Sequence, residues 1–85
     1  MSVDDVKAQL GKGLESARSS MNTLQQAAAT AGEALDLANY TCQGSNHESA
    51  TAALNKAKCA LHEIELTIAR LDAGTELVDT YRASL

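Results

Sequence analysis

The sequence predicts an all-α protein, a coiled-coil-like antiparallel hairpin of two long helices. The 85 residues include no Pro, Phe or Trp and only two Tyr, whereas β-strands are rich in aromatic and β-branched side chains. Ala is abundant, and Leu, Gln, Glu and Lys also favour helix. Apolar residues recur three and four positions apart on both sides of one interruption, at Gln43 and Gly44. We therefore expect a single domain over residues 1–85.

The first helix is expected to cover about residues 3–42. Ser2 precedes it, and Asp5 follows three residues later, which is a shortened form of the capping box. The apolar row on this helix is spaced three and four residues apart and consists of Val3, Val6, Leu10, Leu14, Ala17, Met21, Leu24, Ala28, Ala31, Leu35, Ala38 and Cys42.

A short turn at residues 43–45 is expected to lead into a second helix over about residues 46–84. Gly44 breaks the pattern, and Ser45 with Glu48 forms the S-x-x-E signature of a capping box. Gly74 marks an expected break in this helix, because Gly costs roughly 1 kcal/mol relative to Ala. The row that faces the first helix consists of His47, Ala50, Leu54, Ala57, Leu61, Ile64, Ile68, Leu71, Thr75, Val78, Arg82 and Leu85. Arg82 is the exception within it and, near the chain end, is expected to reach water.

The two apolar rows agree with a single antiparallel register. If the chain folds back at Gly44 and Ser45, the rows meet pair by pair along their whole length, from the turn to Val3 and Leu85. The predicted seam pairs Leu35 with Leu54, Ala28 with Leu61, Leu24 with Ile64, Met21 with Ile68, and Ala17 with Leu71. Arms of about 40 residues predict a rod roughly 60 Å long.

Both helices carry further apolar residues outside the seam. A lone hairpin would leave them in water, and helices that are apolar on more than one face generally pack into larger bundles. We expect a homodimeric four-helix bundle, a larger helical oligomer, or a complex with another helical protein. The predicted partner interface consists of Cys59, His62, Leu66 and Ala69 on the second helix and Ala27, Ala34 and Leu37 on the first.

Two cysteines and two histidines raise the question of a metal site. Cys42 and His47 flank the turn, whereas Cys59 and His62 are three residues apart on the second helix. In the predicted register Cys59 lies opposite Thr30, roughly 18 Å along the axis from Cys42. A zinc ion needs all its donors within about 2.0–2.3 Å. We therefore expect no metal or cofactor within one chain, and the alternative is a Cys/His site shared between chains.

Other classes of function find little support. Glu63 and Glu65 lie on different helix faces and do not pair as an acid and a base, and no Gly-rich phosphate loop is present. We expect no enzyme and no small-molecule substrate. The net charge of −4 disfavours nucleic-acid binding, and no apolar run reaches the roughly 20 residues of a membrane span. The acidic start, MSVDDVKAQL, predicts a cytoplasmic location at synthesis.

The layout resembles the WXG100 (ESAT-6-like) proteins, which are small helical hairpins with a small-residue turn near the middle, here Gly44-Ser45-Asn46. The runs LQQAAATAGEAL and ELVDTYRASL also resemble small helical proteins of actinobacteria. The resemblance implies dimerisation into four-helix bundles and signal-peptide-independent export by type VII secretion. The family's Trp-x-Gly turn is absent, and Leu85 replaces the acid of its C-terminal Tyr-x-x-x-Asp/Glu motif, which would begin at Tyr81.

The sequence thus predicts a non-enzymatic interaction module that acts by self-association or by binding a helical partner. The first alternative is a structural subunit of a helical filament or shell, similar to the subunits of secretion needles. The second is a metal-dependent regulator with a Cys/His site across a subunit interface.

Overall fold

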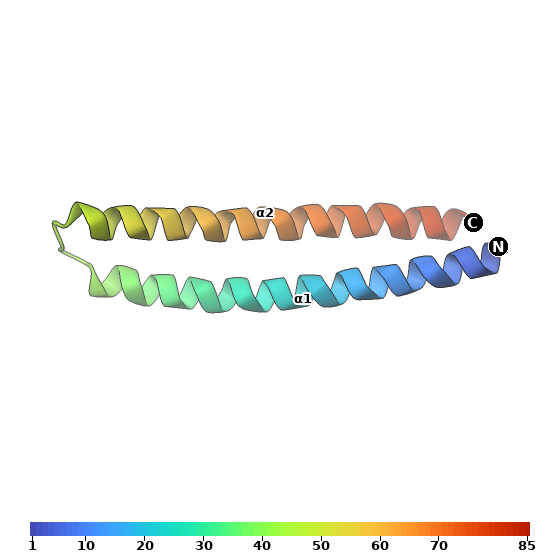
Figure 1. Cartoon of the computed structure of the whole chain (residues 1–85), viewed down its shortest axis with the longest axis horizontal. Coiled ribbons are helices and arrows are strands. Elements are labelled where there is room, and N and C mark those ends of the chain that lie inside the picture. Colours follow the sequence, from blue (N-terminus) through green and yellow to red (C-terminus); the bar gives the residue numbers. More distant parts are fainter.

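The computed structural model describes all 85 residues and consists of two antiparallel helices, α1 (Val3–Thr41, 39 residues) and α2 (Glu48–Ser84, 37 residues). The helices lie side by side along their whole length, with both chain termini at the same end of the rod (Figure 1). The molecule measures 64 × 15 × 15 Å. The predicted all-α hairpin is confirmed, and its length agrees with the expected rod of roughly 60 Å.

The core of the protein is the seam between α1 and α2. Only Leu14, Met21 and Thr75 are fully buried. Nearly all other residues of the two apolar rows are half-buried, and those expected to form the seam include Leu24, Ala28, Leu35, Leu54, Leu61, Ile64, Ile68 and Leu71. The only other half-buried positions lie directly beside the seam and are Lys7, Gly11, Gly32 and Gly74.

Contacts between the helices agree with the predicted register. Ala17 and Leu71, an expected pair, line the same groove between α1 and α2. Near the open end, Arg82 of α2 donates a hydrogen bond from Nε to the carbonyl oxygen of Lys7 at 2.9 Å. The outermost expected pair differs, because Val3 and Leu85 remain 54% and 38% exposed. The half-buried Arg82 therefore closes this end of the seam instead of extending into water.

The start of α1 forms as expected. Ser2 Oγ accepts a hydrogen bond from the Asp5 amide at 3.1 Å, and Asp5 Oδ2 accepts one from the Ser2 amide at 3.3 Å. These two bonds complete the capping box and satisfy amides that have no partner within the helix. The shortened side chain of Asp5 is therefore long enough to take the place of the usual Glu.

The capping box expected at the start of α2 is wrong. Helix α2 begins at Glu48, its N-cap residue is His47, and no side chain caps it. Ser45 Oγ instead accepts a hydrogen bond from the His47 amide at 3.3 Å, so the hydroxyl stabilises the turn and is not free to cap the helix. The turn is consequently longer than the expected residues 43–45.

Gly44 allows the chain to reverse direction. Its φ of +83° is the only positive φ in the chain, and this left-handed conformation is accessible to Gly without steric cost. The Ser45 amide donates to the Cys42 carbonyl at 2.9 Å across this residue. Gly44 therefore performs the role in the turn that the sequence predicted.

The break expected at Gly74 does not occur, because α2 continues without interruption to Ser84. A helical Gly costs only about 1 kcal/mol, and seam residues on either side, Leu71, Thr75 and Val78, hold this turn against α1. The hydroxyl of the buried Thr75 is satisfied within α2, where it donates to the Asp72 carbonyl at 2.8 Å.

Two helical glycines beside the seam provide a matched test of this packing. A Cβ at Gly32 would meet only Leu61 Cδ2, at 3.9 Å, whereas a Cβ at Gly11 would lie 3.0 Å from the Arg82 guanidinium. Gly32→Ala should raise the free energy of unfolding by about 1 kcal/mol. Gly11→Ala should give no gain, because Arg82 must move and lose its hydrogen bond to Lys7, worth about 1–3 kcal/mol.

Urea unfolding followed by circular dichroism measures both changes. Equal stabilisation by the two substitutions would contradict the packing of Arg82 against Gly11.

Candidate functional site

The hairpin leaves large apolar side chains in water. Leu37, Tyr40, Leu77 and Tyr81 are 68%, 76%, 73% and 56% exposed, and Leu66 is 40% exposed. The total accessible surface is 6392 Å², whereas a compact monomer of 8.9 kDa would expose about 4,800 Å². The candidate functional site is therefore a surface and not an enclosed pocket.

The register divides this surface into two flanks, one on each side of the seam. In a helix whose apolar residues recur every three and four positions, residues that are seven positions apart lie on the same side. Arg18 of α1 and Asp79 of α2 meet on one side, with the Arg18 Nη2 and Asp79 Oδ2 atoms 3.6 Å apart. Gly13 and Gly74 lie together on the other side, where both line a groove.

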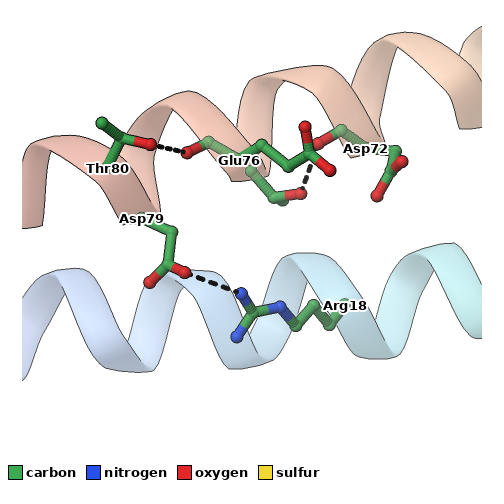
Figure 2. Close-up of polar contacts among 6 residues, drawn as sticks. Arg18, Asp72, Glu76, Asp79 and Thr80 are labelled. Atoms are coloured by element: carbon green, nitrogen blue, oxygen red, sulfur yellow. Dashed lines mark hydrogen bonds and ion pairs between the residues drawn. The ribbon is translucent and has the colours of Figure 1, made fainter. Parts of the chain in front are cut away.

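The flank that carries Arg18 and Asp79 is acidic, and we call it the acidic flank. In Figure 2 the Asp79 side chain of α2 reaches the Arg18 side chain of α1, and Asp72 and Glu76 lie further along α2. Four rows of residues at seven-residue intervals make up this flank: the rows of Arg18 and Glu15 on α1, and the rows of Asp72 and Glu76 on α2. Together they carry eight acidic and two basic side chains. They are Asp4, Glu15, Arg18, Asp36, Glu48, Lys58, Glu65, Asp72, Glu76 and Asp79.

The opposite flank contains no charged residue, and we call it the uncharged flank. Its residues share the side and the seven-residue spacing of Gly13 and Gly74. They are Val6, Gly13, Ser20, Ala27, Ala34 and Thr41 on α1, and Ala53, Ala60, Thr67, Gly74 and Tyr81 on α2. Next to this flank, on the side away from the seam, each helix has a further row of residues, which we call the adjoining outer row. These two rows include the exposed Leu37 and Leu77, and their only charged residues are Lys56, Glu63 and Arg70.

An apolar groove of about 400 Å³ opens on the uncharged flank near the chain termini. Its walls include Leu10, Leu14, Leu71 and Val78. The groove is open because nothing lies within 4 Å of the Cβ positions of Gly13 and Gly74, so two missing side chains leave the seam accessible from this side. We call it the glycine groove. A smaller hollow of about 210 Å³ beside the turn has a more polar lining.

The register distributes the predicted interface residues over more than one side of the hairpin, and their role in association stays a prediction. Cys59, His62, Leu66, Ala69, Ala27, Ala34 and Leu37 are all exposed. However, Ala27, Ala34 and Leu37 lie on the uncharged side, whereas His62 and Ala69 border the acidic flank. Cys59 and Leu66 lie on the outer face of α2, away from the seam. The sequence pattern placed these seven residues on one interface because it did not relate the outer rows of the two helices to each other.

The cysteines and histidines stay apart. Cys42 is half-buried at the turn, Cys59 is exposed, and both are free thiols. His47 and His62 are exposed, and no group of three or more His, Cys, Asp or Glu side chains in the chain could hold a metal ion. Of the predicted turn and cap residues, Gly44 and Ser45 shape the turn, and Glu48 is the first residue of α2.

Two features of the site were not foreseen from the sequence. The glycine groove requires Gly13 and Gly74 to face each other across the seam, and Arg82 binds the backbone of α1 where the sequence suggested that it reaches water. The seven-residue spacing of Gly13, Ser20, Ala27 and Ala34 is the signal that could have revealed the uncharged flank.

No family model, curated protein or solved structure matches the chain. Neither helix is long and apolar enough to cross a membrane. The function must therefore be inferred from the surfaces described above.

The two arginines that bridge the helices should differ in their effect on stability. Arg82→Gln should lower the free energy of unfolding by about 1–3 kcal/mol, because the bond from its charged, half-buried side chain to Lys7 is lost. Arg18→Gln should change it by no more than about 1 kcal/mol, because Arg18 and Asp79 are 56% and 51% exposed. Urea unfolding of both variants measures this, and an Arg18→Gln loss as large as that of Arg82→Gln would contradict it.

Proposed function

We propose that this chain is a non-enzymatic protein–protein interaction module that works by packing its exposed helix faces against another helical surface. The observation that carries the proposal is the extent of uncovered apolar surface, because a stable monomer normally covers its large apolar side chains. The total accessible surface, polar and apolar together, exceeds that of a compact monomer by about 1,600 Å². A standard protein interface buries about 800 Å² of each partner, so association can remove a large part of this excess.

A homodimer that forms a four-helix bundle is the favoured assembly, and a second helical protein is the alternative partner. Two hairpins can pack with their seams roughly parallel, in the geometry of helix bundles. The glycine groove is lined by five apolar residues and also by Arg70, with no acidic residue, which suits an apolar side chain from a neighbouring helix. No nucleic-acid or small-molecule ligand is part of this proposal.

A filament or shell subunit is the second candidate. Leu66 on the outer face of α2 and Leu37 on the uncharged side are both exposed, and they lie on different faces. Contacts between two unlike faces repeat head to tail and produce open polymers unless the ring closes. The presence of apolar residues on more than one face therefore favours this candidate as the runner-up.

Export resembling that of the WXG100 proteins and a metal-dependent role remain proposals of lower rank. The first rests on the hairpin layout. The second would require ligands from two copies, for example Cys59 and His62 of each, because no set of ligands assembles in one chain. Metal analysis of the purified protein tests the second, and detection of the chain outside intact source cells tests the first.

Sedimentation velocity over low to high micromolar concentrations tests the proposal of self-association. The mass of the sedimenting species should be twice the 8.9 kDa mass of the chain. This mass should not increase further as the protein concentration rises. Growth without limit would instead support the filament. A monomer at every concentration would exclude both forms of self-association and leave only a separate helical partner.

A further inference from the structure

We propose that the uncharged flank is the surface through which two copies of this chain associate, in an antiparallel dimer in which Leu37 of each copy enters the glycine groove of the other. This inference rests on the proposed function and names its partner and its contact. Four features of the molecule support it: the distribution of charge, the available area, the positions of Leu37 and the groove, and the internal bonding of three threonine side chains.

The distribution of charge favours a second copy on this flank. The chain carries a net charge of −4, so two copies repel each other wherever their acidic residues meet. The acidic flank has eight acidic side chains against two basic ones, whereas the uncharged flank and its adjoining outer rows have only Glu63 against Lys56 and Arg70. Contact through the uncharged flank keeps the acidic flanks on the outside of the dimer, in water.

The area of the flank is close to what a stable dimer needs. The rod is 64 Å long, and a strip of that length and about one helix diameter, roughly 10 Å, has an area on the order of 600 Å² before side-chain relief is included. A standard interface buries about 800 Å² per partner. Small side chains such as Ala27, Ala34, Ala53 and Ala60 let the helix backbones of two copies approach closely along this strip.

The position of Leu37 matches that of the glycine groove in an antiparallel pair. Leu37 is an apolar side chain 68% exposed, on the uncharged side near the turn, whereas the groove lies near the termini. Gly13 and Leu37 are 24 residues apart on α1, and the point midway between them, Gln25, is close to the middle of α1 (Val3–Thr41). A two-fold axis at that level places each Leu37 at the same height along the rod as the other copy's groove, so the proposed contact is made twice and the assembly closes.

Burial of this flank leaves its threonine hydroxyls satisfied. Thr41 Oγ1 donates to the Leu37 carbonyl at 2.8 Å, and Thr67 Oγ1 donates to the Glu63 carbonyl at 2.9 Å. Thr23, in the adjoining outer row, donates to the Ser19 carbonyl at 3.2 Å. An unpaired hydroxyl would oppose burial, whereas these three have partners within their own helix.

The test compares two exposed leucines on different faces. Leu37→Glu should weaken self-association at least tenfold in sedimentation equilibrium, because a carboxylate replaces the side chain that enters the groove. Leu66→Glu, a matched change on the outer face of α2, should change the dissociation constant by less than about twofold. At concentrations at which each variant is still dimeric, its helicity by circular dichroism should match that of the parent chain.

A size exchange tests the contact itself. Gly74→Leu fills the groove from within its own chain and should weaken the dimer, and the further change Leu37→Ala should restore most of the lost affinity because the total volume at the contact is recovered. If Leu37→Glu loses helicity, the comparison of Gly74→Leu with the double variant still tests whether Leu37 enters the groove. Failure of the second change to restore affinity would overturn the assignment of Leu37 to the groove.

The outcomes separate this inference from the proposed function. A dimer that is dissociated by Leu66→Glu but not by Leu37→Glu, or equally by both, would overturn the inference and leave self-association standing. A polymer without limit would also overturn it, because the symmetrical contact closes on itself. A parent chain that stays monomeric to high micromolar concentration would overturn both this inference and the proposal of self-association.

Discussion

The single seam between α1 and α2 is the contact on which the rest of the structure depends. Each helix has only one neighbour, so each can bury only the row of residues that faces that neighbour. Full burial is consequently limited to Leu14, Met21 and Thr75, and every other apolar side chain is half-covered or exposed. Because a small core of this kind provides little stability by itself, the surfaces on both sides of the seam are where any additional stability has to come from.

The two sides of the seam differ in how far the chain's own side chains cover it. On the acidic side, Arg82 and Gly11 close the open end of the hairpin, since the absence of a side chain at Gly11 lets the guanidinium lie against α1 and bond to its backbone. On the uncharged side, Gly13 and Gly74 leave a groove that nothing in the chain fills. The same residue type therefore serves two purposes: one glycine accommodates a side chain of its own chain, and two others leave room for a side chain from elsewhere.

The sequence predicted the fold well because a single spacing of apolar residues, three and four positions apart, determines both helices and their contact. Apolar rows with the same spacing on both sides of Gly44 gave the helices, the seam and the register, and the reciprocal bonds of Ser2 and Asp5 follow from short-range chemistry. The predictions that differed depend on three-dimensional detail. The Ser45 hydroxyl can accept a hydrogen bond either within the turn or at the start of the helix, and the path of the loop determines which bond forms. The helix continues through Gly74 because packing against α1 outweighs a small local cost. The predicted interface residues stay a prediction, and the register places them on different sides of the hairpin because a row on one helix does not specify how it aligns with a row on the other.

Our central claim is that the seam alone is an incomplete core that a second copy completes. The most direct measurement is the thermal unfolding midpoint as a function of protein concentration, followed by circular dichroism. If folding and dimerisation are coupled, the midpoint should rise by about 4 °C for each tenfold increase in concentration, because mass action favours the folded dimer. A midpoint that stays constant across that range would show that each hairpin is stable by itself and would contradict the claim.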